Sequence, residues 1–371
     1  MNTRTLWIGL GLVTLLSFSV LLFFGKEIYR QKPPIPEKVV SESGEVLFTA
    51  QQIRDGQNVW QSIGGQQVGT VWGHGAYLAP DWSADWLHRE SQTILGGWSQ
   101  TEFGILFDNL APEKQAMLEV RLQKALRANT YDEQTGILRL SADRVNAVKN
   151  NTAYYAGLFM DDTSLENLRE AYSIPAGTIK DKERMAAMNA FFFWAAWACV
   201  TERPGSDLTY TSNWPPDPVI GNKPSAGVVL WTGFSVIMLL VGVGLLAYYN
   251  ARNRSDVLDK SLLPQNDPLG GLNPTPSMKA VLKYYWVVVG LILLQILTGV
   301  ITAHFGVEGN SFYGLDLDNL MPYSIARTWH IQLALFWIAT AWLAAGLYIA
   351  PAVSGHEPKF QKFGVNLLFF A

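Results

Sequence analysis

The sequence predicts an α-helical integral membrane protein in which a bundle of transmembrane helices carries one polar, soluble domain. Four separate apolar runs are each long enough to cross a bilayer. A polar stretch of about 200 residues, the size of one domain, separates the first run from the second. Of the 371 residues, 49% are hydrophobic, 16% are charged and 14 are Trp, which indicates a membrane protein with a substantial polar part.

The first apolar run, Leu6–Gly25, follows Arg4 and leads into the polar segment GKEIYRQKPP. Its apolar core is longer than that of a signal peptide, and no small-x-small cleavage site follows it. We therefore predict that residues 1–25 form a retained N-terminal transmembrane anchor.

Residues 26–224 form the predicted soluble domain. Three segments have helical patterns, namely Pro112–Ala128, Ser141–Leu158 and Ser164–Tyr172. The segment Gly56–Gly97 is rich in Gly and Trp and is predicted to be loop-rich. Met188–Val200 is apolar but, at about 13 residues, is too short to span a bilayer. It is predicted to be either a buried helix or a helix that rests on the membrane.

Residues 225–371 are predicted to begin a transmembrane bundle. Its spans are Val228–Tyr249, Tyr284–Ala303 and Ala326–Ala350. A further apolar run starts at about Phe363 and continues to Ala371. This pattern predicts a chain truncated in a fifth span and belonging to a larger protein.

The basic residues near the spans predict the orientation. They gather in the loops after the second and fourth spans (Arg252, Arg254, Lys260, Lys279, Lys359 and Lys362), whereas Thr302–Ala326 contains no Lys or Arg. Under the positive-inside rule the N-terminus is cytoplasmic and the large domain lies outside. The first span alone disagrees, with Arg4 before it and Lys26, Arg30 and Lys32 after it. Charges that lead into a long translocated domain carry little weight in this rule.

The fourth span contains two ionisable residues, Arg327 and His330, both near its start. An ionisable side chain inside a membrane span is costly and is a functional hypothesis by default. A neutral imidazole keeps a nitrogen lone pair and is a good axial ligand for haem iron. The alternative is a histidine that forms a hydrogen bond to a neighbouring helix.

His304 ends the third span, and Glu308 and Phe312 follow at intervals of four. This spacing places all three on one face if the helix continues. Gly306 and Gly309 weaken that expectation. An ordinary histidine and glutamate at a span end remain the alternative.

Charge and cysteine content exclude several functions. The net charge of −3 gives no indication of nucleic-acid binding. The chain has one cysteine, Cys199, which excludes a disulfide framework, a four-cysteine iron–sulfur site and a Cys-x-x-Cys-His haem attachment. Any redox cofactor must therefore be held without thioether bonds.

These features together resemble the N-terminal half of a quinol-dependent nitric oxide reductase of the haem–copper oxidase superfamily. The resemblance covers the whole chain and is carried by the anchor, by WGHGAYLAPDW, by AHFGVEGNSFYG and by RTWHIQLALFWIATAWLAAGLYIAP. It implies the reduction of two NO to N2O and water with two electrons from a quinol, as used in denitrification and in NO detoxification. It also implies a bacterial inner membrane, with the large domain in the periplasm.

The resemblance implies roles for particular residues. His330 matches the first axial ligand of a low-spin haem b, and His304, Glu308 and Phe312 match the quinol site. Trp72–Pro80 resembles a calcium-binding stretch in relatives that take electrons from cytochrome c.

In that stretch, Gly75 and Tyr77 would offer oxygen atoms to a structural calcium ion. Just before it, Gly65–Gly69 stands where those relatives carry Cys-x-x-Cys-His. The external domain would then have a cytochrome-c-like fold that lacks haem c.

No catalytic residue is predicted within residues 1–371. The ligands of the high-spin haem b and of the non-haem iron are expected beyond Ala371. The partners implied are the bilayer, a membrane quinol and nitric oxide, with no nucleic acid, and a homodimer is compatible with the resemblance. Two other functions remain open: an oxygen-reducing quinol oxidase of the same superfamily, and a membrane-anchored sensor or binding module.

Overall fold

The computed structural model describes residues 3–253, 271–307 and 320–370. The chain divides into two compact units. Unit 1 comprises residues 1–165 and 176–225, and unit 2 comprises residues 166–175 and 226–371. The described residues are mostly helical and include four helices long and apolar enough to cross a membrane, which confirms the predicted class of helical membrane protein.

The long apolar helices are α1 (Thr3–Gln31), α8 (Ala226–Asn253), α9 (Pro276–Val307) and α11 (Tyr323–Ser354). Each contains one of the predicted spans and extends beyond it, because flanking polar residues continue the helix where the apolar run stops. The last apolar run lies in a separate ten-residue helix, α12 (Gln361–Phe370).

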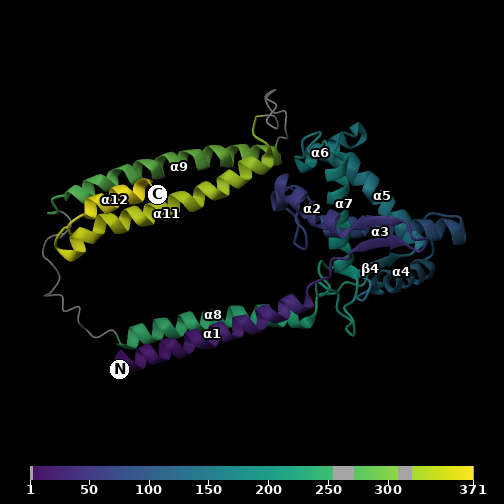
Figure 1. The fold of residues 1–371 in the computed structure, drawn as a ribbon, viewed down its shortest axis with the longest axis horizontal. Helices are drawn as coiled ribbons and strands as arrows, with labels where there is room; N and C mark the ends of the chain where they lie inside the picture. The colour runs from purple at the N-terminus through teal and green to yellow at the C-terminus, as the bar shows by residue number, and fades with distance from the viewer. Residues whose placement is uncertain (1–2, 254–270, 308–319, 371) are drawn as a thin grey trace. The chain divides into compact units, whose positions relative to one another are not determined.

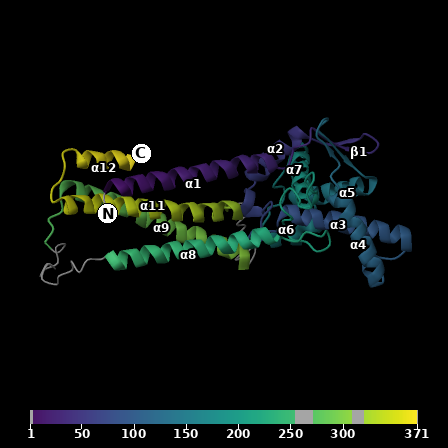
Figure 2. The same ribbon diagram turned by 90° about the horizontal axis from the view of Figure 1, so that it is seen from below.

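In unit 2, α9 and α11 pack side by side, and they remain together in the view turned by 90° (Figures 1 and 2). At one end of this pair α12 packs against α9 through a buried cluster of Val281, Tyr284, Ala344 and Val365. The Tyr284 hydroxyl donates a hydrogen bond of 2.7 Å to the Val365 carbonyl. The beginning of α9 is therefore anchored to α12. The short helix α6 (Glu166–Tyr172) also belongs to unit 2.

Unit 1 is built mainly from α2 (Ala50–Ser62), α3 (Trp82–Phe103), α4 (Pro112–Arg127), α5 (Ala142–Phe159) and α7 (Lys182–Val200). Polar residues define the starts of four of these helices, because their side chains accept hydrogen bonds from otherwise unpaired backbone N–H groups. They are Thr49, Asp81, Ser141 and Asp181. The fifth, α4, begins with Pro112, whose fixed φ suits the first helical turn.

The three predicted helices of the soluble domain are confirmed as α4, α5 and α6. Met188–Val200 is the buried end of α7, which confirms the first of its two predicted assignments. The prediction that Gly56–Gly97 is loop-rich was wrong at both ends, where α2 and α3 lie. Trp82 and Trp86 are four residues apart and form the buried face of α3, so the tryptophans indicated a helix rather than a loop.

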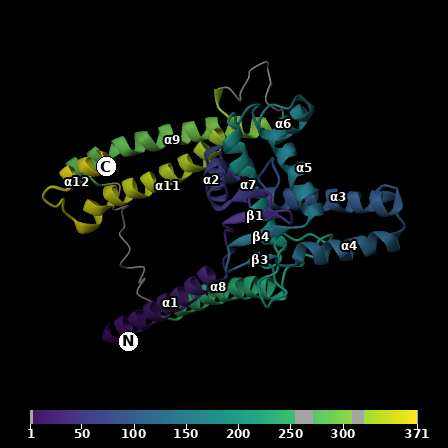
Figure 3. The same cartoon turned by 45° about the vertical axis from the view of Figure 1, so that its right-hand side comes forward.

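Unit 1 also contains a small sheet with the order β2-β1-β4-β3, in which β1 and β4 are parallel (Figure 3). Its strands are β1 (Lys38–Ser41), β2 (Val46–Thr49), β3 (Tyr131–Asp132) and β4 (Ile137–Leu140). These strands are too short to show a period-two pattern in the sequence.

The core of unit 1 is aromatic. The Trp82 ring contacts Tyr155, Phe159 and Phe192 at centroid distances of 6.0, 5.4 and 5.8 Å. These rings join α3, α5 and α7. The helix α2 crosses α7 at Gly56, where an added Cβ atom would lie 2.0 Å from a carbonyl oxygen of α7. The crossing therefore requires glycine.

Three 3-10 turns complete unit 1: η1 (Gly65–Val68), η2 (Phe107–Asn109) and η3 (Thr163–Leu165).

Candidate functional site

The predicted ligand His330 is half-buried on α11 and faces α9. Its Nδ1 atom lies 2.9 Å from the backbone carbonyl oxygen of Gln295 on α9. Gly299, one turn further along α9, leaves room for the ring. A Cβ atom at Gly299 would lie 2.7 Å from Cε1 and 2.8 Å from Nδ1 of His330. The imidazole therefore occupies a notch that exists because residue 299 has no side chain.

This contact determines the chemistry of the ring. A carbonyl oxygen can only accept a hydrogen bond, so Nδ1 carries the proton when this bond forms and Nε2 of the neutral ring keeps its lone pair. Metal-binding histidines have this arrangement, with one nitrogen bonded to a carbonyl and the other bonded to the metal. The bond to α9 thus accommodates both predictions for His330: it joins a neighbouring helix and leaves one nitrogen as a ligand.

Gln295 contacts α11 a second time. Its side-chain carbonyl accepts a hydrogen bond of 2.6 Å from Trp337 Nε1, two turns along α11 from His330. The Thr298 hydroxyl donates to the backbone carbonyl of Gln295 at 3.1 Å. One residue of α9 therefore fixes the rotation and the height of α11 at two points.

The predicted quinol residue His304 is half-buried near the end of α9. It follows Gly299 by five residues, which corresponds to about 7.5 Å along the helix axis and about 140° around it. His304 is thus on a different face of α9 from the notch that receives His330. Glu308 and Phe312 lie outside the described residues. The helix continues through Gly306 to Val307, so Gly306 does not interrupt it.

The predicted calcium residues Gly75 and Tyr77 lie in one well-bonded loop. The Gly75 N–H donates to Thr70 Oγ1 at 2.8 Å, and the Ala76 N–H donates to the Ala79 carbonyl at 2.8 Å. Gly75 has a φ of +89°, a conformation that favours glycine. Tyr77 is exposed.

The Asp81 carboxylate next to this loop is fully engaged. It accepts hydrogen bonds from Thr70 Oγ1 at 2.7 Å, from the Gly73 N–H at 2.6 Å and from the Ala84 N–H at 3.0 Å, and also from the Ser83 hydroxyl. In the part of the chain that the structure describes, no three His, Cys, Asp or Glu side chains gather to hold a metal ion.

Gly65–Gly69, predicted to stand where relatives carry a haem attachment motif, packs against the aromatic core. Gly69 has a φ of +118°, and a Cβ atom there would lie 2.1 Å from the Trp82 ring nitrogen. The Trp60 ring nitrogen donates a hydrogen bond of 3.1 Å to the Gly69 carbonyl.

Cys199 is buried on α7, and burial raises the pKa of its thiol to about 12, so the thiol stays protonated and unreactive.

Two family models match the chain. The model of the cytochrome c-like domain of the nitric oxide reductase protein NorB matches residues 36–216, and the model described as cytochrome c and quinol oxidase polypeptide I matches residues 279–371. Together the two matches support a NorB-type nitric oxide reductase. The chain is an oxidoreductase of the haem–copper oxidase type, a class that implies haem and metal cofactors. No curated protein matched the chain.

The second match includes α9 from residue 279 onward, α11 and the contact between His330 and Gln295. Sequence reasoning identified His330 but not Gln295, Gly299 or Trp337. A signal for Gln295 was available, because it is the one side-chain amide in α9 and a polar residue inside a membrane span needs a partner. Nothing in the sequence alone separates Gly299 from the other glycines of the spans.

Proposed function

We propose that the protein reduces nitric oxide to nitrous oxide with electrons from a membrane quinol, so that 2 NO and one quinol give N2O, water and quinone. The observation that carries this proposal is the His330 notch, which holds an imidazole with one nitrogen bonded and the other left as a ligand. The family matches support the oxidoreductase class, of the haem–copper oxidase type, to which this reaction belongs.

In this proposal His330 would hold the iron of a low-spin haem b through Nε2. When bound, the haem supplies one-electron transfer. The chain itself supplies position: the Gln295 carbonyl keeps the proton on Nδ1, and Gly299 lets the ring approach α9. A high-spin haem b and a non-haem iron belong to the proposed centre, and no residue of this sequence is assigned to them.

The proposed quinol site consists of His304, Glu308 and Phe312. Quinol oxidation releases two protons with two electrons, so the site needs groups that accept a hydrogen bond from the phenolic OH and then take the proton. A neutral imidazole and a carboxylate have this chemistry. His304 lies three residues before the end of α9, which suits a site at the membrane surface.

The quinol site is tested by substituting His304 with Ala and measuring NO reduction with a quinol and with an artificial electron donor. We expect quinol-driven turnover to fall while the haem spectrum and the artificial-donor activity stay close to wild type. His356→Ala is the matched control, because His356 is an exposed histidine beyond α11. Equal loss with both donors, or no loss with quinol, would assign a structural role to His304.

The proposed orientation places the N-terminus in the cytoplasm of a bacterium and residues 26–224 in the periplasm, as a lid without covalent haem. The packing of Gly69 against Trp82 supports this role, because the segment that would carry the haem attachment is part of the aromatic core. Denatured protein stained for haem peroxidase activity should give no band, and a stained band would contradict the proposal.

A calcium ion at Gly75 and Tyr77 and a homodimeric assembly are secondary proposals. Metal analysis after mild chelation tests the first, and the mass of the solubilised particle tests the second.

Oxygen reduction with quinol electrons is the second candidate, and the match to cytochrome c and quinol oxidase polypeptide I favours it. Gas measurements under NO and under oxygen separate the two reactions. A sensor or binding module needs no haem, so a reduced-minus-oxidised spectrum with b-type bands would exclude that reading.

A further inference from the structure

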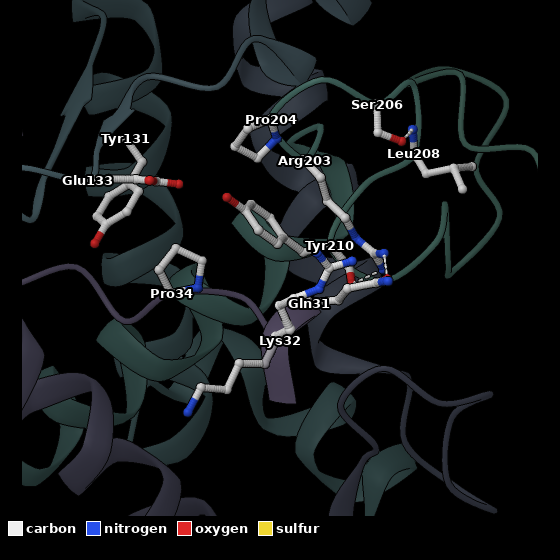
Figure 4. Close-up of a pocket in the computed structure, with 11 residues that line it drawn as sticks. Gln31, Lys32, Pro34, Tyr131, Glu133, Arg203, Pro204, Ser206, Leu208 and Tyr210 are labelled. Atoms are coloured by element: carbon white, nitrogen blue, oxygen red, sulfur yellow. Dashed lines mark hydrogen bonds between the residues drawn. The ribbon is translucent and has the colours of Figure 1, made fainter. Parts of the chain in front are cut away.

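A cavity of about 720 Å³ opens in unit 1 where α1 ends (Figure 4). Arg30, Gln31 and Lys32 line it from the end of α1 and the residue after it. Arg203 and Tyr210 line it from the segment that follows α7. The cavity is therefore formed by two parts of the chain that are distant in sequence.

Arg203 carries a positive charge, and no carboxylate among the described residues forms an ion pair with it. Its guanidinium donates to the Tyr210 carbonyl at 2.9 Å, to Ser212 Oγ at 3.2 Å and to the Gln31 side-chain carbonyl, all of which are neutral groups. Its Nε atom is buried without an acceptor, and removal from water lowers the pKa of the side chain. Among the described residues Arg203 has no ion pair.

Two further cations line the cavity. Lys32 is exposed, and no ion pair joins it to another described residue. Its side chain extends away from Arg203 in Figure 4, so the positive charge is spread over the lining. Arg30 forms an exposed ion pair with Glu27. Glu133 is the one carboxylate among the lining residues, which leaves an excess of positive charge.

The location of the cavity indicates what this charge meets. Arg30 and Gln31 are the last two residues of the candidate span Trp7–Gln31. A cavity beside the last turn of a spanning helix lies at the level of the lipid headgroups. Arg30 and Lys32, together with Lys26, make the first span an exception to the positive-inside pattern. An anionic partner at the membrane surface would give these charges a binding role.

We propose that this cavity binds the phosphate of an anionic phospholipid headgroup. Arg203 supplies a planar guanidinium suited to phosphate oxygens, and Lys32 supplies a compact charge at the exposed edge. The hydroxyls of Tyr131 and Tyr210 are additional donors for a headgroup, and Pro34 and Leu208 give the lining an apolar part. The volume lies within the range of small-molecule sites.

The test is native mass spectrometry of the full-length protein in detergent, titrated with phosphatidylglycerol, phosphatidylcholine or inorganic phosphate. We expect wild-type protein to retain phosphatidylglycerol in preference to phosphatidylcholine. Lys32→Gln should lower that retention about fivefold, the effect of one basic residue near an anionic surface. Lys149→Gln, which removes an exposed lysine elsewhere in unit 1, should leave retention unchanged.

Arg203→Lys keeps the positive charge but removes the planar guanidinium that can donate two parallel hydrogen bonds to phosphate. It should therefore weaken phosphatidylglycerol binding less than Arg203→Gln. Lys32 is exposed, so its variant reports on binding even where an Arg203 variant fails to fold. Unchanged retention in Lys32→Gln, or equal retention of the two lipids, would overturn the proposal. Inorganic phosphate that binds at millimolar concentration and displaces the lipid would assign the site to free phosphate instead.

Discussion

Replacing Gly299 with Ala tests the notch that holds His330. The new Cβ atom would lie 2.7 Å from His330 Cε1, at least about 0.8 Å closer than the usual separation of carbon atoms in contact. The ring must move away from α9, and the 2.9 Å contact between Nδ1 and the Gln295 carbonyl must lengthen or break. Overpacking of this kind typically destabilises a protein by about 1–3 kcal/mol.

The assay is the reduced-minus-oxidised spectrum of the low-spin haem, together with its midpoint potential and the haem content of the purified protein. Loss of an outer hydrogen bond to a ligating histidine typically lowers metal affinity by about 10- to 100-fold. We therefore expect Gly299→Ala to lower haem retention and to shift the potential of the haem that remains.

Gly290→Ala is the matched control, because Gly290 lies on the same helix and a Cβ atom there would meet nothing within 4 Å. Its spectrum should equal that of wild type. A Gly299→Ala protein that inserts and keeps haem content, spectrum and potential unchanged would refute the reasoning. His330→Ala tests the haem ligand itself, whereas Gly299→Ala tests the residues that hold it in place. An intact low-spin haem signal in His330→Ala would show that His330 is not the ligand.

Three further predictions concern unit 1 and are measured by thermal unfolding of the full protein in detergent. Gly56→Ala should destabilise unit 1 by about 1–3 kcal/mol, because the Cβ atom would lie 2.0 Å from a carbonyl oxygen of α7. Gly96→Ala is the control: open space surrounds Gly96, so this variant should stabilise α3 by up to about 1 kcal/mol. Equal effects of the two variants would contradict the close contact between α2 and α7 at Gly56. Glu90→Gln should cost about 3–5 kcal/mol, because it leaves the buried Arg144 charge without its 2.6 Å partner, and a loss under 1 kcal/mol would be inconsistent with that pair. Burial raises the pKa of the Cys199 thiol from 9.0 to about 12, so its contribution to the free energy of unfolding is complete below pH 9 and decreases by about 1.4 kcal/mol per pH unit between pH 9 and about pH 12. The free energy of unfolding of Cys199→Ser should therefore depend less steeply on pH in this range. Identical slopes for wild type and variant would contradict the prediction.

The spans were predictable because their signal is local. About 20 consecutive apolar residues identify a membrane helix without reference to any other part of the chain. His330 was singled out for the same reason, since an ionisable residue in such a run is rare, and its role as a haem ligand stays a prediction. The ends of these helices were not predictable, because a segment that contains Lys279 and Lys283 continues α9 from Tyr284 back to Pro276.

The notch around His330 was not predictable, because it depends on which faces of α9 and α11 meet. Five glycines lie in α8 and α9 between Gly233 and Gly299, and the structure places Gly299 alone among them against another side chain. The helix α3 was missed for a related reason. The Gly and Trp content of Gly56–Gly97 suggested loops, yet Gly96 and Gly97 lie within α3 where space is open, and buried tryptophans stabilise the helix.

The proposed reaction is tested most directly by measuring NO and N2O in anaerobic membranes that contain the full-length protein and a reduced quinol. We predict one N2O formed for every two NO consumed, with the rate lost in His330→Ala and retained in Gly290→Ala. Consumption of oxygen under air without formation of N2O under NO would contradict the account and assign the chain to oxygen reduction.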